Sequence, residues 1–218
     1  MIKIEPNDLK VVNGSMKIVF ILLILSLNFT SFSQKQILFL GNTSSICFQS
    51  DSIEIIKSAT LPDSISNFNS IFVFSTAESI FSISDINRLK NYIEKGGGFY
   101  CGSENWPLQA ESRQITMAFY SKESWGNFDQ KNGIISTEKT NNDLFVNTEN
   151  FPAGKTTVAF PMDYRLKVEV WVNDEPLIQS GKIGMGKIVI DGGYSRFYCE
   201  SMDSEKLEIF ESILKFLE

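Results

Sequence analysis

Short apolar runs, separated by polar and glycine-rich turns, set the pattern of this chain. Residues 36–41, 70–75 and 187–191 each centre on an unbroken apolar run of strand length, which is typical of strands covered on both faces. After the second run, residues 84–105 form an amphipathic stretch, three glycines and another short apolar run. The order strand, helix, strand predicts a parallel pair joined by a right-handed crossover.

The amphipathic stretch predicts a helix with Ser84 as its N-cap and Asp85 in its first turn. Glycines 96–98 should end the helix, because glycine adopts left-handed backbone conformations without steric cost. Residues 99–101 are then expected to form a buried strand, and residues 102–105 the loop at its carboxyl end. The apolar face of the helix consists of Ile86, Leu89, Tyr92 and Ile93.

Less regular stretches predict the elements around this unit. Residues 53–56 fit either a strand or the end of a helix, and residues 62–68 fit a turn or a short helix. Residues 107–121 have a helix-forming composition, with Pro107 in the first turn. The polar stretch 125–150 should form loops and at most one edge strand.

The last third of the chain has the pattern of several strands followed by a helix. We predict strands at 155–160, 166–172 and 176–179, and a turn at 181–186. A final helix over 204–217 should begin with Ser204 as its cap. The core face of this helix consists of Ile209, Phe210, Ile213, Leu214 and Leu217.

Residues 1–33 have the features of an export signal. Met16 and a lysine precede an unbroken apolar run at 18–25, and serines occupy the −3 and −1 positions before Gln34. We predict cleavage between Ser33 and Gln34, which would place the mature protein in the periplasm or outside the cell. Residues 1–15 would then precede the true start at Met16. The alternative is an uncleaved N-terminal anchor, the only membrane contact that we expect.

Composition restricts the chemistry further. The chain of 218 residues carries a net charge of −6 and no basic cluster, which argues against nucleic-acid binding. It contains no histidine, so histidine-activated nucleophiles and imidazole metal sites are excluded. We predict no cofactor and no metal. The three cysteines, Cys47, Cys101 and Cys199, could form one disulfide and leave one thiol, or remain three buried thiols.

Two blocks of the sequence resemble a known fold family. Residues 88–106 (RLKNYIEKGGGFYCGSENW) resemble the LKxYVxxGGG helix and central strand of the class I glutamine amidotransferase-like fold, in the branch of the trehalose-utilisation (ThuA-like) proteins. Residues 176–193 (PLIQSGKIGMGKIVIDGG) are similar to the hairpin before the terminal helix of those domains. The resemblance implies that residues 34–218 form a single α/β domain of three-layer, flavodoxin-like type. It would have a mostly parallel central sheet, helices on both faces and an antiparallel C-terminal hairpin.

The catalytic residues of true amidotransferases do not carry over to this chain. Those enzymes place a cysteine on a sharp strand-to-helix turn between two glycines, and a later histidine and glutamate complete the triad. Cys101 falls near this turn, but Phe99 and Ser103 occupy the glycine positions and no histidine exists. In the ThuA-like register, Ser103 stands where those proteins often carry histidine. The resemblance therefore implies a degenerate, non-catalytic branch.

Candidate ligand-binding residues lie where the predicted parallel strands end, because open α/β sheets bind ligands at that edge. Carboxylates there could hold a cation or act as general acid and base, a cysteine could be reactive, and aromatic rings could bind a sugar. Alternatively, the carboxylates cap helices, the cysteine is buried in a strand and the rings pack loops. The candidates are Glu78, Cys101, Ser103, Glu104, Asp191 and Tyr194, flanked by Trp106, Trp125, Phe197 and Tyr198.

These observations favour an exported, non-catalytic domain that binds a small polar or carbohydrate ligand or an envelope protein partner. The rival interpretation is a carboxylate-dependent hydrolase, with metal assistance, that acts on a glycan or a similar polar substrate. Convergence of Glu78, Glu104 and Asp191 at a pocket would favour the hydrolase, and a shallow edge lined by aromatic rings would favour binding. A domain that only supports a larger assembly is a third interpretation, which a broad exposed apolar patch would indicate.

Overall fold

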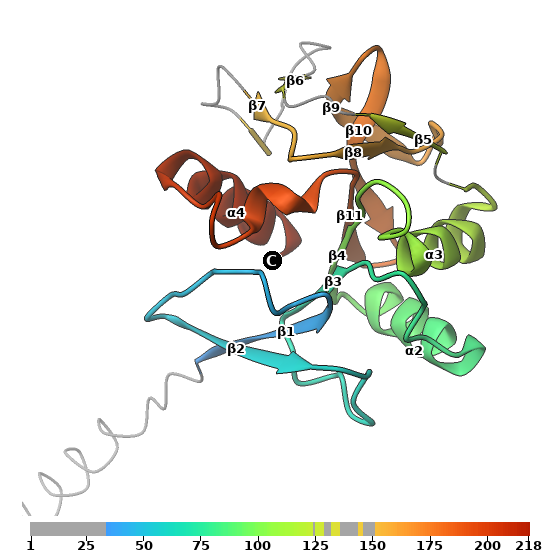
Figure 1. Ribbon diagram of the computed structural model, residues 1–218. Helices are drawn as coiled ribbons and strands as arrows, with labels where there is room; N and C mark the ends of the chain where they lie inside the picture. The colour runs from blue at the N-terminus through green and yellow to red at the C-terminus, as the bar shows by residue number, and fades with distance from the viewer. Residues whose placement is uncertain (1–33, 124, 129–131, 136–143, 146–150) are drawn as a thin grey trace, which may run out of the picture. The chain divides into compact units, whose positions relative to one another are not determined.

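A computed structural model describes residues 34–123, 125–128, 132–135, 144–145 and 151–218 (Figure 1). The predicted leader, residues 1–33, and much of the stretch 125–150 lie outside the described residues. The described part of that stretch has two strands, at 125–128 and 132–135, where at most one edge strand is predicted, because backbone partners from residues 151–172 override the polar local composition. None of the described helices is long and apolar enough to cross a membrane.

The described strands form a nine-stranded mixed sheet in the order β2-β1-β3-β4-β11-β10-β9-β6-β7, and a separate pair, β5-β8. Five neighbouring strands, from β2 to β11, pair in parallel, and the pairs from β11 to β7 are antiparallel. The bounds are β1 Lys35–Gly41, β2 Ile53–Ser58, β3 Ser70–Phe74, β4 Gly98–Gly102, β5 Trp125–Phe128, β6 Asn132–Ile135, β7 Phe151–Pro152, β8 Thr157–Ala159, β9 Leu166–Val172, β10 Glu175–Ile183 and β11 Gly186–Asp191.

This topology confirms the α/β class and the parallel pair β3 and β4, which are joined through a helix. The C-terminal hairpin is also confirmed, but its strands are longer than predicted. Only Gly184 and Met185 remain between β10 and β11, because the pairing continues to Ile183 opposite Gly186. The segment 62–68 contains turns and no helix, and residues 53–58 form a strand rather than a helix end.

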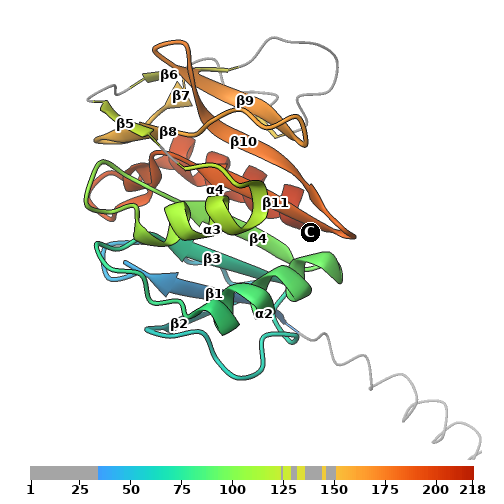
Figure 2. The same ribbon diagram turned by 90° about the vertical axis from the view of Figure 1, so that its right-hand side faces the viewer.

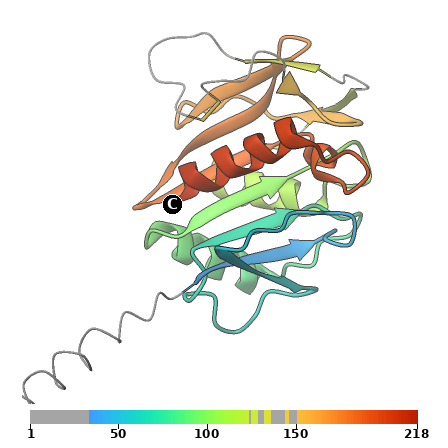
Figure 3. The ribbon, with the colours of Figure 1, turned by 90° about the vertical axis from the view of Figure 1, so that its left-hand side faces the viewer.

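Alternation along the parallel strands divides the core between the two faces of the sheet. Side chains such as Phe39, Phe72 and Tyr100 pack against helix α4, Ser204–Leu217, on one face. Neighbours such as Leu38 and Val73 pack with helices α2, Ile83–Glu94, and α3, Ala110–Tyr120, on the other. Figures 2 and 3 show α2 and α3 in front of one face and α4 in front of the opposite face.

Helix α2 has the predicted apolar face but a different start. Its N-cap is Ser82, not Ser84, because Ser82 Oγ accepts a hydrogen bond from the Asp85 amide (3.1 Å) and the Asp85 carboxylate accepts one from the Ser82 amide (3.0 Å). This reciprocal capping box satisfies two amides that would otherwise lack partners. The helix ends at Glu94, and Gly96 follows with a φ of +109°.

Helix α3 begins later than predicted, and α4 has the predicted bounds but a different N-cap. The N-cap of α3 is Gln109, so Pro107 lies in the preceding turn, where the Trp106–Pro107 peptide bond is cis. The N-cap of α4 is Asp203, whose carboxylate accepts a hydrogen bond from the Lys206 amide (3.0 Å). Every residue predicted for the core face of α4 is buried.

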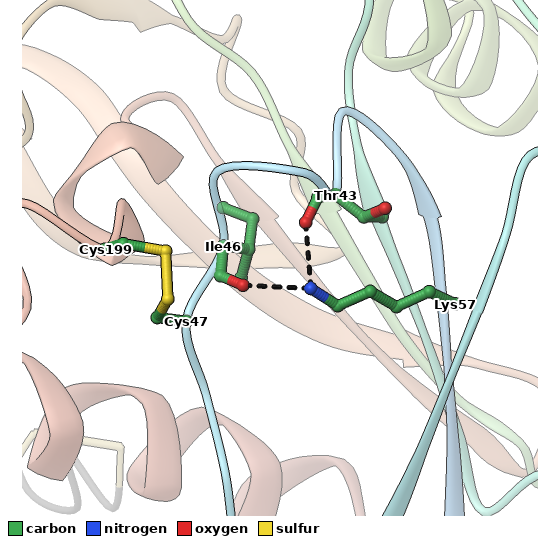
Figure 4. The surroundings of a disulfide bond; sticks show 5 residues. All are labelled: Thr43, Ile46, Cys47, Lys57 and Cys199. Atoms are coloured by element: carbon green, nitrogen blue, oxygen red, sulfur yellow. Dashed lines mark hydrogen bonds between the residues drawn. A yellow bond between two sulfur atoms is a disulfide. The ribbon is translucent and has the colours of Figure 1, made fainter.

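A disulfide joins Cys47, in the loop after β1, to Cys199, near the start of α4 (Figure 4). The same loop is held by Lys57, whose ammonium group donates hydrogen bonds to the carbonyl oxygens of Thr43 (3.0 Å) and Ile46 (3.1 Å). Cys101 remains a free thiol in the core. Of the two arrangements left open by the sequence, the structure therefore has one disulfide and one buried cysteine.

Candidate functional site

The parallel strands end along one border of the sheet, which we call the carboxyl edge. Gly102 at the end of β4 lies opposite Phe74 of β3 and Asp191 of β11, so the residues that follow these strands come together. Asn42 follows β1 at the same border. Of the six candidates, Ser103, Glu104, Asp191 and Tyr194 are placed here, as strand-end reasoning predicts.

Glu104 is buried at the carboxyl edge, and its carboxylate accepts hydrogen bonds from protein groups. Its Oε1 accepts a bond from the Ser195 amide (2.6 Å), and its Oε2 accepts one from the hydroxyl of Thr156. With 2% of the residue exposed, burial raises the pKa of this carboxyl to about 7, although the hydrogen bonds and Arg196 favour the charged form. Glu104 therefore links the end of β4 to two later segments.

Asp191 forms a fully buried ion pair with Arg196. The Asp191 Oδ2 atom also accepts a hydrogen bond from the Tyr100 hydroxyl (2.6 Å), and Oδ1 accepts one from the Gly193 amide (2.9 Å). Burial raises the pKa of Tyr100 well above its usual range, and the nearby Asp191 charge adds to the effect. The carboxylate thus has protein donors on both oxygen atoms, which a buried charge requires.

Tyr194 fills the crevice between β1 and β3. Open α/β sheets bind ligands where the strand order reverses, which here is at β1, because β2 lies on one side of it and β3 on the other. The Tyr194 hydroxyl donates to the carbonyl oxygen of Ser75 after β3 (2.8 Å) and accepts from the amide nitrogen Nδ2 of Asn42 after β1 (3.1 Å). Gly102 allows this approach, since a Cβ atom there would lie 2.8 Å from Tyr194 Cβ.

Ser103 and Cys101 are also buried in the protein interior. The Ser103 hydroxyl accepts a hydrogen bond from the Ser112 hydroxyl (2.8 Å) and is fully buried. Cys101 is fully buried in the cluster under α2 and α3, and burial raises the pKa of its thiol well above the ordinary value. The structure therefore supports the interpretation of Cys101 as a buried strand residue, and not the reactive thiol.

Glu78 does not join the other candidates. Glu78 is exposed, and its backbone carbonyl oxygen accepts a hydrogen bond from the Thr76 hydroxyl (2.5 Å). The segment after β3 is instead bound by the buried carboxylate of Glu111 in α3, which accepts hydrogen bonds from the amides of Thr76 (2.6 Å) and Ile80 (3.1 Å). The sequence signal for Glu111 is its position four residues before Ile115, on the core face of α3.

The segment Pro152–Val158, which we call the cover segment, crosses the carboxyl edge. Its residues are held by Arg196, which donates to the carbonyl oxygens of Pro152 (2.7 Å) and Ala153 (2.6 Å), and by a bond from the Val158 amide to Gly192 (2.8 Å). A Cβ atom at Gly192 would lie 1.8 Å from the Val158 carbonyl oxygen, so glycine is required for this approach. Arg196 and Thr156, which sequence reasoning missed, are thus central to the edge.

The arrangement holds segments together and leaves few groups for a ligand. Among the described residues, no group of three or more aspartate, glutamate or cysteine side chains could hold a metal ion. A cavity of about 780 Å³ lies beside the cover segment, and its charged lining residues are paired: Lys155 with Glu200, Lys206 with Asp203, and Arg196 with the buried Asp191. Neither Glu104 nor Asp191 is among the described residues that line it.

Comparison with known proteins shows the fold alone. No protein-family model matches the sequence, and no curated protein matches it. The cytoplasmic protein STM1381 of Salmonella typhimurium LT2 is similar in structure, with a TM-score of 0.64 and 10% identity over 84% of this chain and 100% of that one. A ThuA-like protein of Bacteroides uniformis has a TM-score of 0.55 and 8% identity, over 84% of this chain and 90% of its own.

A β-galactosidase of Bacillus circulans is also similar over part of its length. Its TM-score is 0.55 and its identity 8%, and the match covers 84% of this chain but only 31% of the galactosidase. The similarity to the ThuA-like protein shows that the chain has a ThuA-like fold, as the blocks at 88–106 and 176–193 predict.

Proposed function

We propose that this protein is an exported, non-catalytic binding domain, from a degenerate branch of the class I glutamine amidotransferase-like superfamily. The observation that carries the proposal is the closure of the carboxyl edge by the protein's own groups. Tyr194 occupies the crevice where a ligand would bind, and the carboxylates of Glu104 and Asp191 accept hydrogen bonds from buried donors. The nucleophile position holds a buried thiol, and the chain has no histidine to activate it.

Export to the periplasm or the cell exterior is part of the proposal. The leader features of residues 1–33 support it, and so does the disulfide between Cys47 and Cys199, because such bonds persist mainly in oxidising compartments. We also propose a flavodoxin-like, three-layer arrangement for the parallel half, since its strand order β2-β1-β3-β4-β11 corresponds to 2-1-3-4-5. The partner would be a small polar or carbohydrate ligand or an envelope protein.

A carboxylate-dependent hydrolase is the second candidate, and the pKa of Glu104 favours it. A carboxyl with a pKa of about 7 suits a general acid at neutral pH. The obstacle is access, because the Glu104 carboxyl is buried and bonded to Ser195 and Thr156. Asp191, the other buried carboxylate described at the carboxyl edge, is paired with Arg196. Reaction at this carboxyl would require the cover segment to open.

Turnover assays separate the two candidates. The purified protein is incubated with glutamine and with nitrophenyl glycosides, and released ammonia and nitrophenol are measured. The binding proposal predicts no release above the uncatalysed rate. Turnover that is lost in Glu104→Gln but kept in Glu200→Gln, a surface control, would overturn it in favour of the hydrolase.

A further inference from the structure

A second cavity, which we call the amino-end pocket, lies at the opposite end of the parallel strands from the carboxyl edge. Its volume is about 880 Å³, within the range of small-molecule sites. Its walls come from the turn at 63–69, the last turns of α2 with Gly96 and Gly97, and the end of α4. It lies near the start of β1, where Lys35 pairs with Glu218, and near the end of α4, marked C in Figure 3.

The floor of the amino-end pocket is apolar. Ile65, Tyr92 and Leu217 are buried beneath it, and Phe68 is half-buried. The Tyr92 hydroxyl donates a hydrogen bond to the Phe68 carbonyl oxygen (3.1 Å), which fixes the ring against the turn. Gly97 lies against this ring, since a Cβ atom there would be 2.3 Å from it.

The wall formed by the turn at 63–69 is held in place by Arg88. The guanidinium group donates to the carbonyl oxygens of Pro62 and Asp63 (2.8 Å for Asp63) and pairs with Asp85 (3.0 Å). The turn has no regular secondary structure, and these bonds, with that from the Tyr92 hydroxyl, attach it to α2. A wall ordered before binding lowers the entropy lost when a ligand binds.

The rim carries exposed polar side chains that have no partner among the described residues. Ser64, Ser66, Asn91 and Lys95 line the pocket, are exposed, and make no side-chain interaction with other described residues. This differs from the carboxyl edge, where Glu104, Asp191 and Tyr194 are all bonded to protein groups. Of these two described sites, the amino-end pocket therefore offers polar side chains to a ligand.

The geometry points to a neutral sugar, a mono- or disaccharide, as the ligand of the amino-end pocket. Two hydroxyls and an amide on the rim both donate and accept, which matches sugar hydroxyls. The half-buried Phe68 in the lining offers an apolar surface to one face of a pyranose ring. An anion is disfavoured, because Lys35 and Arg88 are paired with carboxylates, and the charge of Lys95 is balanced by that of Asp63 in the same lining. The inference rests on the proposed binding role and names its site and ligand class.

A nuclear magnetic resonance titration of the purified protein tests the inference. Glucose, galactose, mannose, N-acetylglucosamine, cellobiose and lactose are added separately, and amide shifts are followed. We expect at least one sugar to give saturable shifts at residues 64–68, 91–92 and 95–97. Asn91→Ala should weaken that binding by about 3- to 10-fold, the effect of one lost hydrogen bond. Asn67→Ala is the matched control, because Asn67 is an exposed neighbour that is not among the described residues lining the pocket, and should leave binding unchanged.

Each other outcome has a defined meaning. No saturable shift with any of these sugars would overturn the inference. Shifts at Glu104, Thr156 and Ser195, unaffected by Asn91→Ala, would overturn the amino-end site but preserve a binding role. Hydrolysis of a nitrophenyl glycoside would instead contradict the proposed non-catalytic function, whichever site binds sugar.

Discussion

Glu104 is a carboxyl whose protonation differs between the folded and the unfolded chain. Its hydrogen bonds from Ser195 and Thr156 favour the charged form, but burial outweighs them and raises the pKa from 4.5 to about 7. In the unfolded chain the same carboxyl is solvated and loses its proton near its ordinary pKa. Between these two values the folded protein keeps a proton that the unfolded chain has released.

The stability of the protein should therefore depend on Glu104 in a defined pH window. As pH rises from about 4.5 to about 7, the unfolded state binds fewer protons than the folded state, so the free energy of unfolding falls. The contribution of this residue to that fall is on the order of 3 kcal/mol. In Glu104→Gln the amide still accepts from Ser195 and can donate to Thr156, so the variant should lack the fall.

The measurement is denaturant unfolding of the wild type and Glu104→Gln at several pH values. The other carboxylates are common to both proteins, so the difference between the two free energies isolates Glu104. We expect the wild type to lose stability relative to the variant up to about pH 7 and then to level off. A constant difference across the window would show that Glu104 titrates as a solvated carboxyl.

Strand-end reasoning predicts which residues reach the carboxyl edge, but not what they do there. Ser103, Glu104 and Asp191 immediately follow or end buried strands, so their position can be deduced from the apolar pattern alone. Their partners cannot be deduced, because Thr156 and Arg196 come from segments whose packing depends on long-range contacts. Glycine 192 gives a partial signal, since a glycine pair directly after a strand indicates close backbone approach.

Helix α2 illustrates how far the pattern defines an element. The apolar spacing correctly predicts the buried face, because three- and four-residue repeats are independent of where the helix starts. The start is different, since Ser82 and Ser84 are both acceptable caps and only Ser82 stands three residues before Asp85, as a capping box requires.

The two strands of the C-terminal hairpin, β10 and β11, are also longer than predicted. Their pairing overrides the turn preference of the glycines at 181 and 186.

The two serines provide a matched test of the α2 cap. Ser82→Ala removes the acceptor of the Asp85 amide and should lower the free energy of unfolding by about 1 kcal/mol. Ser84 lies in the first turn and is exposed, so Ser84→Ala should change the free energy of unfolding by less than about 0.5 kcal/mol. Urea unfolding of both variants measures the difference. Equal effects, or a larger loss for Ser84→Ala, would contradict this assignment.

At the scale of the whole molecule, the disulfide ties the first loop of the sheet to the segment before the last helix. The bridge joins residues separated by 152 positions, and the Cys199 amide also bonds to the Ser45 carbonyl oxygen (2.8 Å). The sequence alone leaves this pairing open, because the separation gives no information on distance in the fold.

Reduction should lower the stability of the wild type. Replacing both Cys47 and Cys199 by serine, or adding reductant, should reduce the free energy of unfolding by about 2–4 kcal/mol, because the unfolded chain gains freedom. Guanidinium unfolding with and without reductant measures this loss. The double serine variant is the control, since reductant should not affect it. An identical unfolding midpoint for reduced and oxidised wild type would refute the prediction.

The ion pair of Asp191 and Arg196 joins β11, the turn after it and the cover segment. Its removal therefore tests how much the polar groups of the carboxyl edge contribute to stability. The central claim is that these polar groups hold the fold together instead of performing chemistry. Residues kept for catalysis can often be removed without loss of stability, whereas a buried charge that loses its partner is strongly destabilising.

The most direct measurement is the free energy of unfolding of Asp191→Ala beside that of Glu200→Ala. Asp191→Ala leaves the buried Arg196 unpaired and should cost about 3–5 kcal/mol. Glu200 pairs with Lys155 at the surface, so Glu200→Ala should cost less than about 1 kcal/mol. An Asp191→Ala protein as stable as the wild type, or more stable, would contradict the account and indicate a carboxylate held for function.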